Sequence, residues 1–356
     1  MNLKFKNKKI TGILTVLPEK ELKFEDEIEN YAFSKAQSMK LKLIMGYNKR
    51  RVVSNGTSIS DLSIFGMNHL FENNLLDKKD VDGLVLVTQS PDQFMPATTH
   101  IIHGELGLKN DIYCLDINQG CSGYPIGLMN AFMLLEQDEI NKVVVLNGDI
   151  LSVKVSKNDR SSGPLTGDGL SITIVEKQSK ANLIYGTIKA DGKGADVLEI
   201  PAGGFKLPSN QETAKLFTDN SGNKRSMDHL TMKGDLVFNF VLREVPVMIE
   251  NLLNAASISK NDVDYFMFHQ PNKFILQQLA KGIGVSEEKL PNNVVENYGN
   301  SASATIPINI VYNLGENLLN NSFLICMAGF GTGLSWSSLL MPIGNLKFCK
   351  SIEYNS

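Results

Sequence analysis

Residues 80–91 read DVDGLVLVTQSP, and residues 262–271 read DVDYFMFHQP. Each stretch has Asp-Val-Asp, a short apolar run, and then Gln and Pro. A second echo joins GDGLSITIVE, which begins at Gly167, to GTGLSWSSLL, which begins at Gly331. The echoes occur in the same order, with offsets of 182 and 164 residues. We therefore predict two copies of one unit with different loop insertions; chance similarity between short strand-like pieces is the alternative.

Short apolar runs alternate with helical patterns along both predicted halves, 1–180 and 181–356. This alternation favours the α/β class, with parallel or mixed sheets covered on both faces. A loop insertion is expected over 186–223, which is rich in Gly, Pro, Lys and Asp. The expected strands are 83–87, 112–117, 142–146, 171–175, 265–268, 323–327 and 335–340, and the expected helices are 122–137, 237–256, 273–281 and 303–319.

The composition is that of a globular protein. Of 356 residues, 42% are hydrophobic and 21% are charged, and the formal net charge is −3. These values exclude a disordered chain and give no reason to expect nucleic acid or an anionic membrane as a partner. The longest uncharged run, 317–346, is interrupted by Asn, Gly and Pro, so we interpret it as buried strands rather than a membrane helix. With no signal-peptide pattern and no CxxC pair among the four cysteines, we expect a cytoplasmic, disulfide-free protein.

Cys121 is a candidate nucleophile. It follows the strand-like IYCLDIN and precedes the uncharged run GYPIGLMNAFMLL, which is apolar on all sides and indicates a buried helix. The start of such a helix supplies free N–H groups and a positive dipole end, which favour a thiolate. The alternative is a small buried cysteine that packs a strand–helix corner.

His269 and Asn300 are candidates in the second half. His269 ends the buried-looking strand in FMFHQPN, and catalytic groups gather at the carboxyl ends of strands in α/β sheets. Asn300 precedes a predicted helix in GNSASATIP, at an offset of 179 residues from Cys121, which is close to the offset of the duplication. Asn300 is either an ordinary helix N-cap or a fixed amide donor for a developing oxyanion. His269 is either a structural residue with its hydrogen bonds satisfied or a residue of the functional site. His100 and His103 lack acidic or cysteine partners, so no metal site is expected.

At these residues the chain resembles the β-ketoacyl-acyl-carrier-protein synthase III family of the thiolase-like superfamily. The likeness runs through most of the chain, and its markers occur in family order. They are PDQFMPATT from Pro91, DINQGCSGY around Cys121, NDRSS from Asn158, GDG from Gly167, IPAGG from Ile200, HQPN from His269, GNSASATIP from Gly299 and GFGTGLSW from Gly329.

The resemblance implies a five-layered αβαβα fold, internally duplicated, that works as a homodimer without a cofactor. Cys121 would take an acyl group from an acyl-CoA or acyl-carrier-protein primer. His269 and Asn300 would bind the thioester carbonyl of malonyl-acyl carrier protein, whose decarboxylation gives the carbanion that attacks the acyl-cysteine. Backbone N–H groups of Cys121 and of the turn Gly331-Thr332-Gly333 would hold the oxyanion of acyl transfer.

Several positions that face substrate in the family match or depart from its pattern here. Arg160 matches an arginine on the CoA side, and Met95 matches a residue that reaches the partner subunit's acyl pocket. Asn272 belongs to the HQPN motif, followed by Lys273. The family's early Thr-Gly-Ile-Arg is Met-Gly-Tyr-Asn at 45–48, and its arginine after HQxN is Phe274. These departures leave open whether the primer arrives on CoA or on a carrier protein.

Other activities of the same fold remain as alternatives. The first is transfer of an acyl group from Cys121 to a hydroxyl or amine, although such relatives tend to lack the asparagine that Asn300 provides. A degradative thiolase needs a second cysteine where Thr332 stands, and elongating synthases use two histidines. A catalytically silent subunit would have lost the nucleophile.

Overall fold

The fold has five layers, in which two mixed β-sheets alternate with three layers of helices. The structure is a computed structural model, and it describes residues 1–355. One sheet has six strands in the order β17 (Phe348–Tyr354), β2 (Lys8–Pro18), β8 (Gly169–Lys177), β7 (Lys142–Asp149), β5 (Gly83–Val87) and β6 (Tyr113–Ile117). The other has five strands in the order β1 (Asn2–Lys6), β9 (Leu183–Ala190), β16 (Ser335–Gly344), β15 (Ser322–Gly331) and β14 (Tyr265–Phe268).

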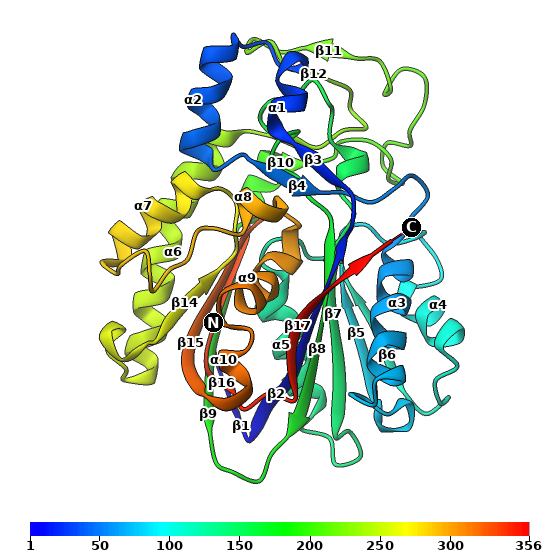
Figure 1. Ribbon diagram of the computed structural model, residues 1–356, viewed down its shortest axis with the longest axis vertical. Helices are drawn as coiled ribbons and strands as arrows, with labels where there is room; N and C mark the ends of the chain where they lie inside the picture. The colour runs from blue at the N-terminus through cyan, green and yellow to red at the C-terminus, as the bar shows by residue number, and fades with distance from the viewer. Residues whose placement is uncertain (356) are drawn as a thin grey trace.

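Helices fill the space between the sheets and cover both outer faces (Figure 1). The central layer contains α5 (Gly123–Leu134) and α9 (Thr305–Leu314), with the short α10 (Asn317–Asn320) after α9. On the outer face of the six-stranded sheet lie α3 (Ile59–Glu72) and α4 (Thr98–Leu106), and on that of the five-stranded sheet lie α6 (Gly234–Ala256) and α7 (Lys273–Ile283). The predicted αβαβα arrangement is confirmed.

The internal duplication is visible in matching strands. The first echo of the sequence forms β5 and β14, each parallel to its neighbour, β7 or β15. The second echo forms β8 and β16, each antiparallel to that same neighbour. The last Asp of each Asp-Val-Asp has one role in both halves: Asp82 accepts from the N–H of Lys142 at 3.1 Å, and Asp264 accepts from that of Leu324 at 2.7 Å. The echo therefore reflects one repeated unit.

The terminal strands cross between the sheets. β1 pairs antiparallel with β9 in the sheet of the second half, while the C-terminal β17 pairs parallel with β2 in the sheet of the first half. The two sequence segments 1–180 and 181–356 therefore interlock through their ends, and each sheet needs strands from both.

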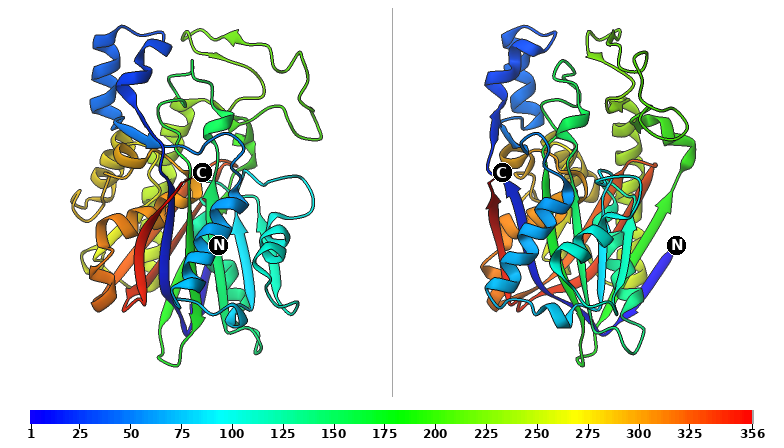
Figure 2. Two further views of the ribbon diagram at one scale, coloured as in Figure 1. Left: turned by 45° about the vertical axis from the view of Figure 1, so that its right-hand side comes forward. Right: turned by 90° about the vertical axis from the view of Figure 1, so that its right-hand side faces the viewer.

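A smaller group of elements gathers at one end of the molecule, as Figure 2 shows from two further sides. These elements surround the carboxyl ends of the central strands, where the candidate site lies. They are β3 (Glu21–Lys23), α1 (Phe24–Glu27), α2 (Lys35–Met45), β4 (Lys49–Arg51), β10 (Leu198–Glu199), β11 (Phe217–Thr218), β12 (Lys224–Arg225), β13 (Thr231–Met232) and α8 (Val295–Tyr298).

Two sequence predictions about the elements are wrong in part. The loop insertion begins later than expected, because residues 186–190 belong to β9. The helix expected over 303–319 is divided: a 3₁₀ turn covers Ala302–Ala304, α9 ends at Leu314, and α10 follows Gly315. Over residues 1–355, no helix combines the length and apolar character that crossing a membrane would require.

Candidate active site

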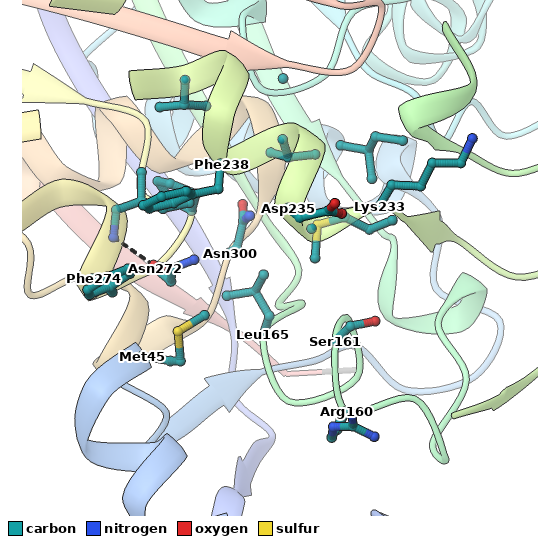
Figure 3. A pocket seen from close by; sticks show the side chains of 18 of the residues that line it. Met45, Arg160, Ser161, Leu165, Lys233, Asp235, Phe238, Asn272, Phe274 and Asn300 are labelled. Carbon is teal, nitrogen blue, oxygen red and sulfur yellow. Dashed lines mark hydrogen bonds between the residues drawn. The ribbon is translucent and has the colours of Figure 1, made fainter. Parts of the chain in front are cut away.

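Cys121 lies where two cavities meet. The first has a volume of about 550 Å³ and is lined by Cys121, His269 and Asn300. The second has a volume of about 780 Å³, and Cys121, Asn300 and Thr332 are among its walls. Figure 3 shows side chains around the first cavity, with Asn300 near the middle of the view and Arg160 toward its lower edge. Residues from both halves of the chain thus surround Cys121, which belongs to the walls of both cavities.

The glycine turn after β15 packs directly against Cys121. A Cβ placed on Gly331 would lie 3.1 Å from the Cys121 Sγ, and one on Gly329 would lie 2.6 Å from the Cys121 carbonyl oxygen. The contact at Gly329, and a further one of 2.8 Å between a Cβ on Gly331 and the Cys121 Cβ, are too short for a side chain, so any larger residue would push the turn away from the nucleophile. The turn is also tied to the first half, since Ser335 Oγ donates to the Thr332 carbonyl at 2.9 Å and lies 2.5 Å from Ser122 Oγ.

The Cys121 thiol is neutral in the resting site, which corrects the expectation of a thiolate. Although part of the residue is exposed, burial of the thiol, and secondly the charge of Asp149, raise its pKa to about 12. The backbone N–H groups of Cys121 and Thr332 act in the opposite direction and hold this pKa down. Desolvation outweighs these N–H groups at the start of the helix because it disfavours the charged form of the sulfur.

His269 is a buried, neutral imidazole at the end of β14. Its backbone N–H donates to the Ala328 carbonyl at 2.8 Å, which continues the strand ladder by one residue. Its Nδ1 lies 2.7 Å from the hydroxyl oxygen of Thr305, and its ring meets that of Phe330 edge-on. Burial lowers the pKa of His269 to about 3, so the ring carries one proton across the physiological range.

Asn300 is held at the boundary between the halves. Its N–H donates to the Leu165 carbonyl at 2.7 Å, and its own carbonyl accepts from Gly167 at 3.1 Å. The side-chain Oδ1 accepts the N–H of Ala302 at 2.9 Å. With the oxygen occupied in this way, the Nδ2 amide hydrogens remain available to the cavity. The N-cap alternative is wrong, because the residue that caps the following 3₁₀ turn is Ser301; Asn300 Oδ1 instead closes an Asx turn at Ala302, and its amide donor stays available.

Comparisons with known proteins agree with this architecture. The family model of 3-oxoacyl-[acyl-carrier-protein (ACP)] synthase III matches residues 115–192, and the model of its C-terminal part matches residues 253–343. A Campylobacter jejuni protein with the provisional name 3-oxoacyl-[acyl-carrier-protein] synthase 3 is 30% identical over 351 residues, 97% of each chain. A beta-ketoacyl-[acyl-carrier-protein] synthase III from Streptococcus sanguinis is 31% identical over 83% of this chain and 88% of its own.

A solved structure of a relative has the same fold as this chain. The crystal structure of a 3-oxoacyl-(acyl-carrier protein) synthase from Burkholderia xenovorans superposes with a TM-score of 0.92 at 32% identity, and 99% of each chain is covered. The chain belongs to the 3-oxoacyl-[acyl-carrier-protein] synthase III family. Cys121, His269 and Asn300 therefore stand at one cavity in a fold of this family.

The remaining positions that the synthase III resemblance had marked are distributed around the same cavities. Arg160 lines the first cavity, where its guanidinium lies 4.0 Å from the centre of the Phe33 ring and donates to the Asn223 side chain at 3.2 Å. Asn272 also lines it, and its side chain caps α7 by accepting the N–H of Ile275 at 2.9 Å. Figure 3 shows this hydrogen bond close to Phe274.

Three further residues lie at the edges of the site. Lys273 is outside the lining of the first cavity and forms an ion pair with Glu296 at 3.2 Å. Met95 is 77% exposed beside Phe94, which lines the second cavity. Gly333 follows Thr332 in the turn, with a φ of 137° that favours glycine. Among residues 1–355, no cluster of His, Cys, Asp or Glu side chains is arranged to hold a metal ion.

Sequence reasoning missed three features of the site. The rings of Phe238 and Phe274 stack 5.6 Å apart at the first cavity, and their pairing across α6 and α7 has no local signal. Asp149 ends β7 fully buried and accepts the Gln89 N–H at 2.6 Å; its place at the carboxyl end of an apolar run was a usable signal. Thr305 contacts His269, but it is the first residue of a helix, as threonine often is, and nothing local marked it.

Proposed function

We propose that this protein catalyses a decarboxylative Claisen condensation between an acyl primer and malonyl-acyl carrier protein. The observation that carries the proposal is the convergence of Cys121, His269 and Asn300 on one cavity, from three separate segments of both repeats. A sulfur nucleophile beside two neutral N–H donors suits a reaction with an acyl-enzyme step and an enolate step.

In the first half-reaction, Cys121 attacks the thioester carbonyl of the primer. The sulfur–carbon bond to Cys121 forms, the bond to the carrier sulfur breaks, and the thiol proton ends on the departing carrier thiol. The N–H groups of Cys121 and Thr332, which already reach the sulfur, face the place where negative charge develops on the carbonyl oxygen. The second cavity, which meets Cys121 from the other side, has room for the acyl chain.

In the second half-reaction, the malonyl thioester occupies the first cavity. Loss of CO₂ leaves the electron pair on the thioester enolate, whose oxygen accepts hydrogen bonds from His269 and from Asn300 Nδ2. Because neither group is acidic here, they stabilise the enolate without protonating its carbon. The carbon then attacks the acyl carbonyl and the bond to Cys121 breaks; the sulfur leaves as a thiolate, which takes one proton from solvent to return to the thiol. One such donor is worth about 3–4 kcal/mol of barrier.

The assembly we propose is a cytoplasmic homodimer that receives its substrates from acyl carrier protein. β6 is the edge strand of the six-stranded sheet and pairs only with β5 within residues 1–355. An unpaired edge is a template for strand addition, and a second copy would satisfy it. The exposed Phe94 and Met95 near the second cavity would then be covered by that copy.

The proposal is tested by intact-protein mass spectrometry with CoA and carrier-protein thioesters. The native chain is expected to gain one acyl mass, and Cys121→Ala to gain none. Asn300→Asp is expected to keep self-acylation but to lose malonyl decarboxylation by about 10²–10³-fold, because the second half-reaction alone uses its amide. An adduct on Cys121→Ala would refute the nucleophile, and equal loss of both steps in Asn300→Asp would refute the division of roles.

A further inference from the structure

The hydroxyl of Thr305 is fully buried and has three polar neighbours. Its oxygen lies 2.7 Å from His269 Nδ1, 3.3 Å from the backbone nitrogen of Gln270 and 3.0 Å from the Ala302 carbonyl oxygen. Among residues 1–355, Thr305 Oγ1 is the side chain that hydrogen-bonds the His269 ring. Both residues are almost inaccessible to solvent, at 0% and 1% exposure.

The single hydroxyl proton decides where the imidazole proton lies. The Gln270 N–H can only donate, so it occupies one lone pair of the Thr305 oxygen. The hydroxyl proton then points either to the Ala302 carbonyl or to His269 Nδ1. In the second case Nδ1 accepts, and the ring must carry its proton on Nε2.

Two distances favour donation to His269. O–H···O bonds cluster near 2.7–2.8 Å and N–H···O bonds near 2.9–3.0 Å. The Thr305 to Ala302 separation of 3.0 Å is at the long end of the range for a hydroxyl donor, whereas 2.7 Å to Nδ1 is at the short end of the range for a ring N–H donor. The Ala302 carbonyl also accepts the backbone N–H of Thr305, so it keeps a partner when the hydroxyl turns away.

We propose that Thr305 is a positioning residue that donates to His269 Nδ1 and thereby holds the imidazole as the Nε2–H tautomer. The inference rests on the proposed function only in what that Nε2–H does: it is the donor that the enolate oxygen requires. Thr305 itself touches no substrate. A neutral ring with the proton on Nδ1 would present a lone pair to the same oxygen and would repel it.

The state of the ring is measured on the intact protein by two-dimensional NMR with ¹⁵N-histidine, assigned with His269→Gln. In the native protein, Nε2 is expected to be protonated and Nδ1 bare. Thr305→Val keeps the shape but removes the donor, so the proton is expected to move to Nδ1, which can donate to the neighbouring Ala302 carbonyl. Thr305→Ser is the matched control and is expected to keep the native tautomer.

The kinetics of the Thr305 variants distinguish a positioning role of this residue from a role in packing alone. Thr305→Val is expected to lose malonyl decarboxylation by about 10²-fold in kcat, with KM and Cys121 self-acylation close to native values. Thr305→Ser is expected to stay within a few fold of native in both steps. A variant that only disturbs packing would slow both half-reactions and leave the tautomer unchanged.

If Thr305→Val fails to fold, the spectrum of the native protein alone still tests the proposed Nε2–H tautomer of His269. A proton on Nδ1 in the native protein would overturn the inference, as would an unchanged Nε2–H in Thr305→Val. Absence of acylation and decarboxylation in the native protein would instead overturn the proposed function, while the tautomer measurement would remain valid. The two failures are therefore distinguishable.

Discussion

At the scale of single residues, the site contains a thiol and an imidazole that are both neutral at physiological pH. The pKa of Cys121 is raised to about 12 and that of His269 is lowered to about 3, and burial is the first cause of both shifts. A thiolate–imidazolium pair, as in cysteine proteases, is therefore absent from this resting site. The sulfur must become nucleophilic as the thioester binds, when the N–H groups of Cys121 and Thr332 face the developing charge.

The reactivity of Cys121 should accordingly show no plateau near neutral pH. Since the raised pKa keeps the thiol protonated below about 12, the thiolate fraction rises about tenfold per pH unit. We expect the rate of iodoacetamide alkylation at Cys121, followed by peptide mass spectrometry between pH 7 and pH 10, to rise in the same proportion. Denatured protein is the control, in which the rate levels off near pH 8.5. Levelling of the native rate below pH 9 would contradict the neutral resting thiol.

At the scale of elements, the contact between the glycine turn and Cys121 is the part of the site with the least spare volume. Gly331→Ala would place a methyl group 2.8 Å from the Cys121 Cβ and 3.1 Å from its Sγ. The thiol or the turn must shift, and misplacement of about 1 Å is enough to reduce a reaction about 10²-fold. We expect self-acylation to fall by that factor while the circular dichroism spectrum is unchanged.

A matched control for this substitution is Gly192→Ala, because a Cβ at Gly192 meets no atom within 4 Å. It is expected to acylate at the native rate. Native-like acylation of Gly331→Ala would show that the turn has more freedom than its packing against Cys121 indicates.

The helices and strands also show which elements local sequence patterns can predict and which they cannot. The apolar runs at 83–87 and 265–268 predicted their strands without error, because both are buried on both faces and bounded by Asp-Val-Asp. The strand β9 was not predicted at all, since its buried positions include Gly186 and Thr187, which give no apolar run. The helix expected over 303–319 breaks at Gly315, where the pattern of apolar residues continues through the break.

The same limit applies to the candidate site. Cys121, His269 and Asn300 were found because each stands at the end of a buried strand or at the start of a helix, where the local sequence marks it. The resting charge of Cys121 was mispredicted because desolvation depends on walls built by both halves. The contacts of Thr305, Asp149 and the Phe238–Phe274 pair depend on packing between distant segments, which no local pattern contains.

At the scale of the whole molecule, duplication explains why one cavity receives groups from both halves. α5 and α9 both contribute to the core cluster between the sheets, and Cys121 and Asn300 each come shortly before one of these helices. The interlocking of β1 and β17 fixes the two sheets to each other, so the donors of one repeat stay aligned with the nucleophile of the other. β6 is one of the four edge strands of the two sheets within residues 1–355, and it is the edge that we propose a second copy covers.

The proposed dimer is tested at that edge. Tyr113, at the start of β6, is 45% exposed, and a lysine there would place like charges near each other across a symmetric strand pair. We expect the native chain to sediment as two copies and Tyr113→Lys to dissociate at least tenfold more readily. Val247→Lys on α6, with similar exposure on the opposite outer face, is the control and is expected to remain dimeric.

Activity measured on the same samples connects the edge to the site. If a second copy covers Phe94 and Met95 and closes the second cavity, then monomeric Tyr113→Lys should acylate Cys121 more slowly, and the rate should recover as protein concentration rises. A purely local effect of the lysine would give a rate that does not depend on concentration. A native chain that sediments as one copy while retaining full activity would rule out the dimer and leave the chemistry to the single chain.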